Sequence, residues 1–263
     1  MPNYKLLSQG STKINKSNTI QDEYFSRILY LAPDDLADGK RTVCPYAKVA
    51  KCNEACLNTA GLGGVYSSIQ KARIRKTLMF LNDRTEFMKL LIKDIGKFLK
   101  ECEDLGKKPA LRLNGTSDIQ WENIYIGNME QYSIDTTNLE VFDKKQLNLD
   151  CQNIFELFPQ IQFYDYTKIP TRKVDHINNY HLTWSYSQAN DKYASLFEKV
   201  PYNKAVVFFD ALPSMFKGLK VIDGDKHDMR FLDKTNSVVG LLAKGKAKQD
   251  DTGFVIKALQ VAW

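Results

Sequence analysis

The chain has 263 residues, of which 43% are hydrophobic and 26% are charged, with a formal net charge of +6 at pH 7. A chain of this length can bury a full core without disulfide bonds, and this composition is ordinary for a soluble globular protein. No apolar run approaches the roughly 20 residues of a membrane span, and the polar N-terminus lacks the apolar segment of a secretory signal. We therefore expect a cytoplasmic protein without membrane contact, in which reducing conditions disfavour structural disulfides.

The expected elements, in chain order, begin with a loose N-terminal arm over residues 1–25, followed by one domain over residues 26–263. A short apolar run at 27–31 predicts the first strand, and helices are expected at about 65–81 and over 84–106. Further strands are predicted at 109–115, 161–168, 180–187, 204–211, 219–225 and 237–245. Several of these strands are continuous apolar runs, which suits parallel strands covered on both faces.

Small, polar or charged residues close nearly every one of these strands. The carboxyl ends of parallel strands build the active sites of α/β proteins, so the pattern predicts a shared functional rim, although turns are polar in any protein. The rim residues are Asn114, Thr116, Ser117 and Asp118, then Asp165 to Lys168, Ser185 and Ser187, Asp210, Asp223 to Asp225, and Lys244.

Three of the five cysteines, Cys44, Cys52 and Cys56, fall within thirteen residues of one loop after the first strand. Thiolates are ligands for soft metals, and a cubane iron–sulfur cluster can be held by three of them with one iron left open. Structural zinc normally takes four ligands, and the three histidines lie far from the loop in sequence. Free thiols that serve only as small apolar side chains are the third alternative. Cys102 and Cys151 are isolated and are expected to pack in the core.

The strings "CPYAKVAKCNEACLNTAG", "QKARIRKTLMF", "LRLNGTSDIQWE" and "KVIDGDKHDMRFLD" resemble a family of tailed-phage proteins named only by a gene-product number, gene product eighty-eight. The resemblance covers nearly the whole chain and implies a bacteriophage protein that acts in the host cytoplasm. It brings no activity with it.

More distantly, the layout resembles radical SAM enzymes, which place a three-cysteine loop after the first strand of a partial (β/α)6 barrel. This resemblance implies a single α/β domain of partial-barrel type and a [4Fe–4S] cluster on Cys44, Cys52 and Cys56. It also implies reductive cleavage of S-adenosylmethionine (SAM) at the open iron. The residues that it assigns to SAM are Asn114, Thr116, Ser117, Asp118, Lys168, Ser185 and Ser187. Those assigned to an unknown substrate are Asp210, Asp223, Asp225, His227, Asp228 and Arg230, with Asp223, Asp225, His227 and Arg230 as the catalytic candidates.

The cysteine gaps here, seven and three residues, differ from the gaps of three and two that are usual in radical SAM enzymes. A second function therefore stays open, in which an iron–sulfur cluster or zinc ion stabilises the loop of a binding protein. Phosphate contacts to nucleic acid would then come from a basic segment after the cysteine loop. This segment comprises Lys71, Arg73, Arg75 and Lys76.

Overall fold

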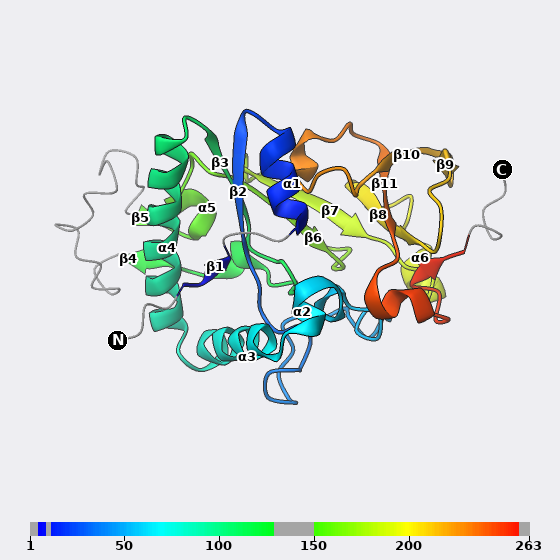
Figure 1. The fold of residues 1–263 in the computed structure, drawn as a ribbon, viewed down its shortest axis with the longest axis horizontal. Helices are drawn as coiled ribbons and strands as arrows, with labels where there is room; N and C mark the ends of the chain where they lie inside the picture. The colour runs from blue at the N-terminus through cyan, green and yellow to red at the C-terminus, as the bar shows by residue number, and fades with distance from the viewer. Residues whose placement is uncertain (1–4, 9–11, 129–149, 258–263) are drawn as a thin grey trace.

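A largely parallel β-sheet forms the centre of the computed structural model, which describes residues 5–8, 12–128 and 150–257 (Figure 1). Among these residues ten strands belong to this sheet. In spatial order they are β1 (Leu7–Ser8), β2 (Tyr24–Leu29), β3 (Lys108–Arg112), β6 (Gln162–Thr167), β7 (Tyr180–Ser185), β8 (Asn203–Phe208), β11 (Ser237–Leu242), β10 (Leu219–Asp223) and β9 (Met215–Phe216), with β12 (Val255–Ile256) paired to β8.

The strand pairings confirm most of the expected sheet. The strands from β2 to β10 in this order are all parallel to their neighbours, whereas β1 and β9 add antiparallel edges. The predicted runs at 109–115, 161–168, 180–187, 204–211 and 237–245 are adjacent, as expected. The sheet does not close, however, and β11 lies between β8 and β10 although it follows β10 in the chain. The fold is therefore a mixed α/β fold with an open sheet, and the expected partial barrel is not confirmed.

Two long helices form the crossover between β2 and β3, namely α3 (Ser67–Asn82) and α4 (Arg84–Asp104). Helix α4 begins where the Asp83 carboxylate accepts the Glu86 N–H at 3.0 Å, which satisfies one of the free amides of the first turn. The helix ends at Asp104, and the chain turns at Gly106, whose positive φ of 62° suits a residue without a Cβ. The apolar side of α4 packs against β3 and β6 in the main core, which contains Phe87, Leu91, Ile95, Leu111 and Phe163.

The remaining elements are short. Near the cysteine loop lie the 3-10 helix η1 (Leu57–Thr59) and α2 (Gly61–Val65). The connection between β3 and β6 includes η2 (Trp121–Asn123), the two-stranded pair β4 (Gly127–Asn128) and β5 (Asp150–Cys151), and α5 (Ile154–Leu157). Helix α6 (Asp191–Ala194) precedes β8, η5 (Arg230–Leu232) precedes β11, and η6 (Gly245–Gln249) follows it. In the described parts of the chain no helix has both the length and the apolar character needed to cross a membrane.

In the described residues of the N-terminal segment, the chain packs on the sheet and does not form the loose arm that was expected. Strand β1 pairs with β2, and Leu6 is completely buried. Helix α1 (Thr12–Ile20) lies against β2, where Asn18 exchanges two hydrogen bonds with the Ser26 backbone (Figure 1). The sequence did not predict this packing because α1 is largely polar and only a few of its side chains, such as Ile14, are buried.

The two faces of the sheet differ in what covers them. We call the face opposite α4 the inner face, and at β3, β6 and β7 it carries Ala110, Arg112, Tyr164, Tyr166, His181, Thr183 and Ser185. Alternation along each strand places these side chains together. Part of the inner face is covered by the segment around η5, because Met229 and Phe231 pack against Tyr164. This face therefore carries many more polar groups than the α4 side.

Candidate functional site

The cysteine loop, residues 41–61, lies across the carboxyl ends of the parallel strands. The Asp118 N–H, just beyond β3, donates to the Val43 carbonyl at 2.8 Å. The Ser187 hydroxyl, beyond β7, donates to the Ala50 carbonyl at 2.8 Å. Because these partners follow two different strands, the loop spans the rim that the sequence predicted for it.

The three thiols of the loop lie within electrostatic reach of one another. Burial raises the pKa of Cys44 well above its ordinary value, and charges on Cys52 and Cys56 would raise it further. Burial likewise raises the pKa of Cys52 to about 11 and also raises that of Cys56. In the protein without a bound cation the three groups are therefore neutral thiols, and a metal that binds them must displace their protons.

Two cations oppose this desolvation, Arg73 at Cys56 and Lys168 at both Cys52 and Cys56. The Lys168 ammonium lowers the pKa values of Cys52 and Cys56, and its own pKa is lowered by burial. The ammonium donates to the Ser185 hydroxyl at 2.8 Å and to the Ser185 carbonyl at 3.1 Å. Two of the residues assigned to a cofactor thus contact each other, and one of them, Lys168, is within electrostatic reach of the three thiols.

Neither of the isolated cysteines joins the loop. Cys102 and Cys151 are both buried in the main core, which confirms that they pack there. Among the histidines, His176 is exposed and His181 lies on β7, while His227 contacts Arg230. Within the described residues, no group of three or more His, Cys, Asp and Glu side chains is arranged to hold a metal ion.

The segment Asn114–Asp118, which was assigned to SAM, has its polar side chains bonded within the protein. The Asn114 side-chain amide oxygen Oδ1 accepts from the Ser117 hydroxyl and from the Ile119 N–H, both at 2.9 Å. The Thr116 hydroxyl donates to the Leu31 carbonyl at 2.5 Å. These bonds shape the turn after β3 and hold it against the end of β2. Contact of these residues with a cofactor stays a prediction.

Asp118 belongs to a buried network centred on Arg172. One Asp118 carboxylate oxygen accepts the Lys168 N–H at 2.7 Å, and the other lies 3.3 Å from the Arg172 guanidinium. Arg172 also makes two bonds of 2.7 Å to the Glu122 carboxylate, a bidentate pair. Burial raises the pKa of Asp118, and the Arg172 charge opposes that shift. Arg172 therefore holds Asp118, which in turn holds the Lys168 backbone.

The four residues expected to be catalytic are distributed between the rim and the inner face. Asp223 is exposed at the end of β10, and Asp225 pairs with Lys244 at 2.6 Å. Arg230 is fully buried, with its guanidinium 3.1 Å from the His227 ring nitrogen Nδ1. The other two residues assigned to the substrate also separate, because Asp210 is exposed and Asp228 is buried.

The basic residues of α3 are not all available to a partner. Arg73 lies over the Tyr30 ring and donates to the Asn58 side chain. Lys76 donates to the Leu6 carbonyl at 2.6 Å, and burial lowers its pKa to about 8. Lys71 and Arg75 are exposed. A nucleic-acid contact on this helix stays a prediction, with two of its four proposed residues engaged in the fold.

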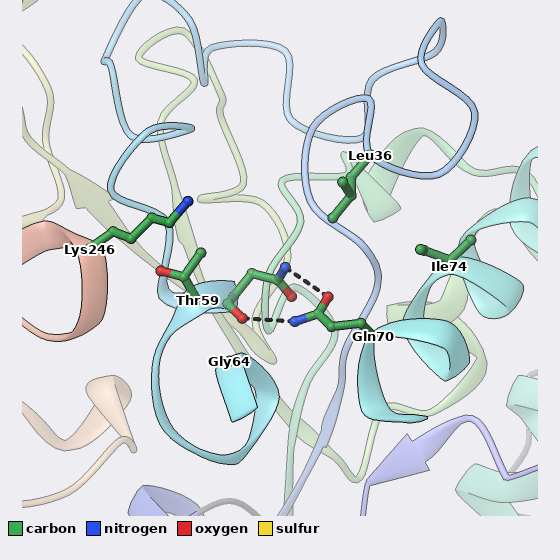
Figure 2. A pocket seen from close by; sticks show the side chains of 7 residues that line it. Leu36, Thr59, Gly64, Gln70, Ile74 and Lys246 are labelled. Carbon is green, nitrogen blue, oxygen red and sulfur yellow. Dashed lines mark hydrogen bonds between the residues drawn. The ribbon is translucent and has the colours of Figure 1, made fainter. Parts of the chain in front are cut away.

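A pocket of about 400 Å³ lies beside the cysteine loop (Figure 2). In Figure 2, Gln70 of α3 exchanges two hydrogen bonds of 2.9 Å with Asn58, while Leu36, Ile74 and Lys246 come from the surrounding segments. The Asn58 N–H also donates to the Cys56 sulfur at 3.4 Å. The pocket is large enough for a small molecule, and its wall is directly linked to one of the three thiols.

Two polar residues of the inner face, Arg112 and Thr183, were missed by sequence reasoning, and Tyr166 was named only within the rim range 165–168. The three residues lie on the neighbouring strands β3, β7 and β6. One signal was present, because an arginine inside the apolar run "PALRL" has to find a buried partner. Tyr166 and Thr183 gave no such signal, since both residue types are common in strands.

The comparisons with known proteins agree with one of the two resemblances. The family model described as Gene product 88 matches residues 5–258. No curated protein and no solved structure was found to match the chain. The chain therefore belongs to the Gene product 88 family, and the resemblance to these phage proteins is confirmed. The comparisons do not support the likeness to radical SAM enzymes.

Proposed function

We propose that this member of the Gene product 88 family is an iron–sulfur protein that uses its cluster for redox chemistry on a small molecule. In this proposal Cys44, Cys52 and Cys56 hold the cluster. The observation that carries the proposal is that three partly buried thiols lie within electrostatic reach of Lys168 at the carboxyl edge of a parallel sheet.

The residues present fit such a cluster better than they fit a single ion. One metal ion needs its ligands around one point, and no described group of three or more candidate side chains has that arrangement. A cubane distributes three thiolates over three irons, so its ligands stand farther apart. Iron–sulfur sites are also tuned by hydrogen bonds to sulfur, and the Asn58 N–H offers one to Cys56.

Each surrounding residue has a role that its contacts support. A bound cluster would supply one-electron transfer, which protein side chains alone do not provide. Lys168 would offset the negative charge of the thiolates, and Ser185 holds the lysine in place. Asp118 holds the Lys168 backbone. Burial of the thiols would keep water away from the site.

The finer proposals concern SAM and the barrel. Three protein thiolates would leave one iron of a [4Fe–4S] cluster open, and SAM is the ligand that the resemblance implies. What supports the barrel is the sequential order of β2, β3, β6, β7 and β8, with the cysteine loop after the first of them. The exchanged order of β10 and β11 departs from a barrel.

The deciding experiment is anaerobic purification followed by iron and acid-labile sulfide analysis, with visible absorption spectra. We expect a brown protein that loses its colour when Cys44, Cys52 or Cys56 is changed to Ala. The matched control is Cys102→Ala, which removes a buried thiol from the core and should leave the colour unchanged. Adding SAM to the reduced protein should alter the electron paramagnetic resonance spectrum if SAM occupies the open iron.

Two outcomes would overturn the proposal. A colourless protein with stoichiometric zinc would support a structural metal site, and a metal-free protein would support simple thiols. In either case salt-dependent binding of nucleic acid, weakened by Lys71→Ala and Arg75→Ala, would favour the binding function instead.

A further inference from the structure

Eight buried polar atoms on and around the inner face have no hydrogen-bond partner among the described residues. Three of them, Arg230 Nε, Asp228 Oδ1 and Asp233 Oδ2, lie in ion pairs. The other five are Arg112 Nε, Tyr166 Oη, His181 Nε2, Thr183 Oγ1 and Arg230 Nη1. Thr183 and Arg230 are fully buried, with exposed fractions of 0%. Buried polar groups in folded proteins are nearly always paired with protein, water or a ligand, so this concentration of unpaired atoms needs an explanation.

The five side chains, which we call the inner-face cluster, converge on one place. Tyr166 and Thr183 are directly opposite each other in the β6–β7 ladder, and His181 is two residues before Thr183 on the same face. The Arg112 guanidinium lies 4.6 Å from the centre of the Tyr166 ring. Helix η5 brings Arg230 against β6 and β7, within electrostatic reach of Tyr166 and His181.

Cations and carboxylates both surround this cluster. Three cations, Arg112, Arg230 and Lys13, gather here, and three carboxylates face them. Asp228 lies 2.9 Å from Arg112 and 3.1 Å from Lys13, Asp233 lies 3.2 Å from Arg230, and Asp165 lies 4.0 Å from Arg112. Burial lowers the pKa of His181 to about 4, so it is neutral at neutral pH. The two arginines each keep a free N–H, and arginine forks match carboxylate and phosphate oxygens.

The five unpaired atoms are buried, but three of the side chains that carry them are partly exposed elsewhere. Tyr166 and His181 are half-buried, and the Arg112 side chain keeps 11% of its exposure. It is also close to the thiols, since Lys168 follows Tyr166 by two residues and Ser185 follows Thr183 by two. Two residues along a strand span about 7 Å. A small molecule held at the cluster would therefore extend toward the cysteine loop.

We propose that the inner-face cluster binds the carboxylate or phosphate group of a small molecule. Arg112 and Arg230 supply charge and N–H donors, and the hydroxyls of Tyr166 and Thr183 complete the site. The assignment of this molecule as the substrate rests on the proposed function, because it places the ligand beneath the cysteines. The anion site itself does not depend on a cluster.

The test is calorimetric titration of the full chain with inorganic phosphate and, separately, with malonate, at constant ionic strength in chloride. We expect one of the two anions to bind at one site, which decides between phosphate and carboxylate. Thr183→Val and Tyr166→Phe should each weaken binding by about tenfold or more, because each removes a hydrogen bond to a charged group. Lys226→Ala, an exposed residue between β10 and η5, is the matched control and should bind normally.

Thermal unfolding of the ligand-free variants distinguishes a loss of anion binding from a loss of folding. Thr183→Val replaces an unpaired buried hydroxyl by a methyl of similar shape, so the ligand-free variant should be at least as stable as the wild type. The inference is overturned if neither anion binds, or if both variants bind like the wild type. The titration is repeated on Cys44→Ala, where retained anion binding without iron separates this inference from failure of the cluster proposal.

Discussion

Replacing Arg172 by Met tests whether the network behind the cysteine loop depends on one buried cation. Arg172 is completely buried in its side chain and bonds to the carboxylates of Glu122 and Asp118. It also donates to the Ile119 carbonyl at 3.1 Å and to the Tyr180 hydroxyl at 2.7 Å. Methionine fills a similar volume but offers none of these donors, so the change isolates the charge and hydrogen bonds from packing.

The expected loss follows from what Arg172 leaves behind. Both carboxylates are nearly buried, with exposed side-chain fractions of 9% for Asp118 and 7% for Glu122. Breaking one buried ion pair costs about 3–5 kcal/mol of unfolding free energy. Because two carboxylates lose their partner, we expect the upper end, about 5 kcal/mol, which for a chain of this size lowers Tm by roughly 10 °C.

Urea unfolding at neutral pH, followed by circular dichroism, measures this loss. Arg84→Met is the matched control, since Arg84 is exposed and stacks on the Phe80 ring at 3.9 Å, which is worth only about 1 kcal/mol. Losing Arg172 should also raise the pKa of the Asp118 carboxyl further, because the Arg172 charge opposes the upward shift that burial causes, so the deficit should shrink at about pH 5. A loss no larger than that of the control, or a deficit independent of pH, would refute the reasoning.

Two further changes probe the same region. Burial raises the pKa of Asp165 to about 7, so between about pH 4 and 7 the folded state keeps a proton that the unfolded state releases. The free energy of unfolding should therefore fall by about 1.4 kcal/mol per pH unit as pH rises from about 4 to 7. Asp165→Asn should remove this dependence from unfolding free energies measured across that range, and an unchanged pH profile would contradict the prediction. Gly64→Ala should destabilise the protein by roughly 1–3 kcal/mol, because a Cβ there would overlap the Thr59 carbonyl, whereas at Gly63 it would meet only the flexible end of Arg73. Equal melting temperatures for Gly64→Ala and Gly63→Ala would show that the backbone around Thr59 adjusts freely.

Much of the central sheet could be predicted from local sequence. Continuous apolar runs bounded by turn residues located β3, β6, β7, β8, β10 and β11 to within a few residues. The position of the cysteine loop also followed, because a loop after a parallel strand must lie at its carboxyl end. The second helix was equally clear, since its apolar spacing, its cap at Asp83 and the terminal Gly106 all agree.

The candidate site was only partly predictable, because its residues are joined by contacts over long sequence distances. Arg172 meets Asp118 and Glu122 across 54 and 50 residues. Asn114, Thr116 and Ser117 were assigned to a cofactor by resemblance, yet Asn114 and Ser117 bond within the turn after β3 and Thr116 bonds to Leu31 beyond β2. A polar residue near a strand end has the same sequence signature in both roles, and only its partners distinguish them.

By itself the sequence determined the strands, the long helices and the loop with its three cysteines, because these depend on apolar periodicity, caps and spacing between neighbours. Only the tertiary structure decided that β11 lies between β8 and β10, that the N-terminal segment supplies β1 and α1, and that Lys168 is within electrostatic reach of the thiols. It alone also gathered Arg112, Tyr166, Thr183 and Arg230 on one face. The physical reason is that burial and electrostatic pairing depend on which distant segments meet, and no local pattern records that.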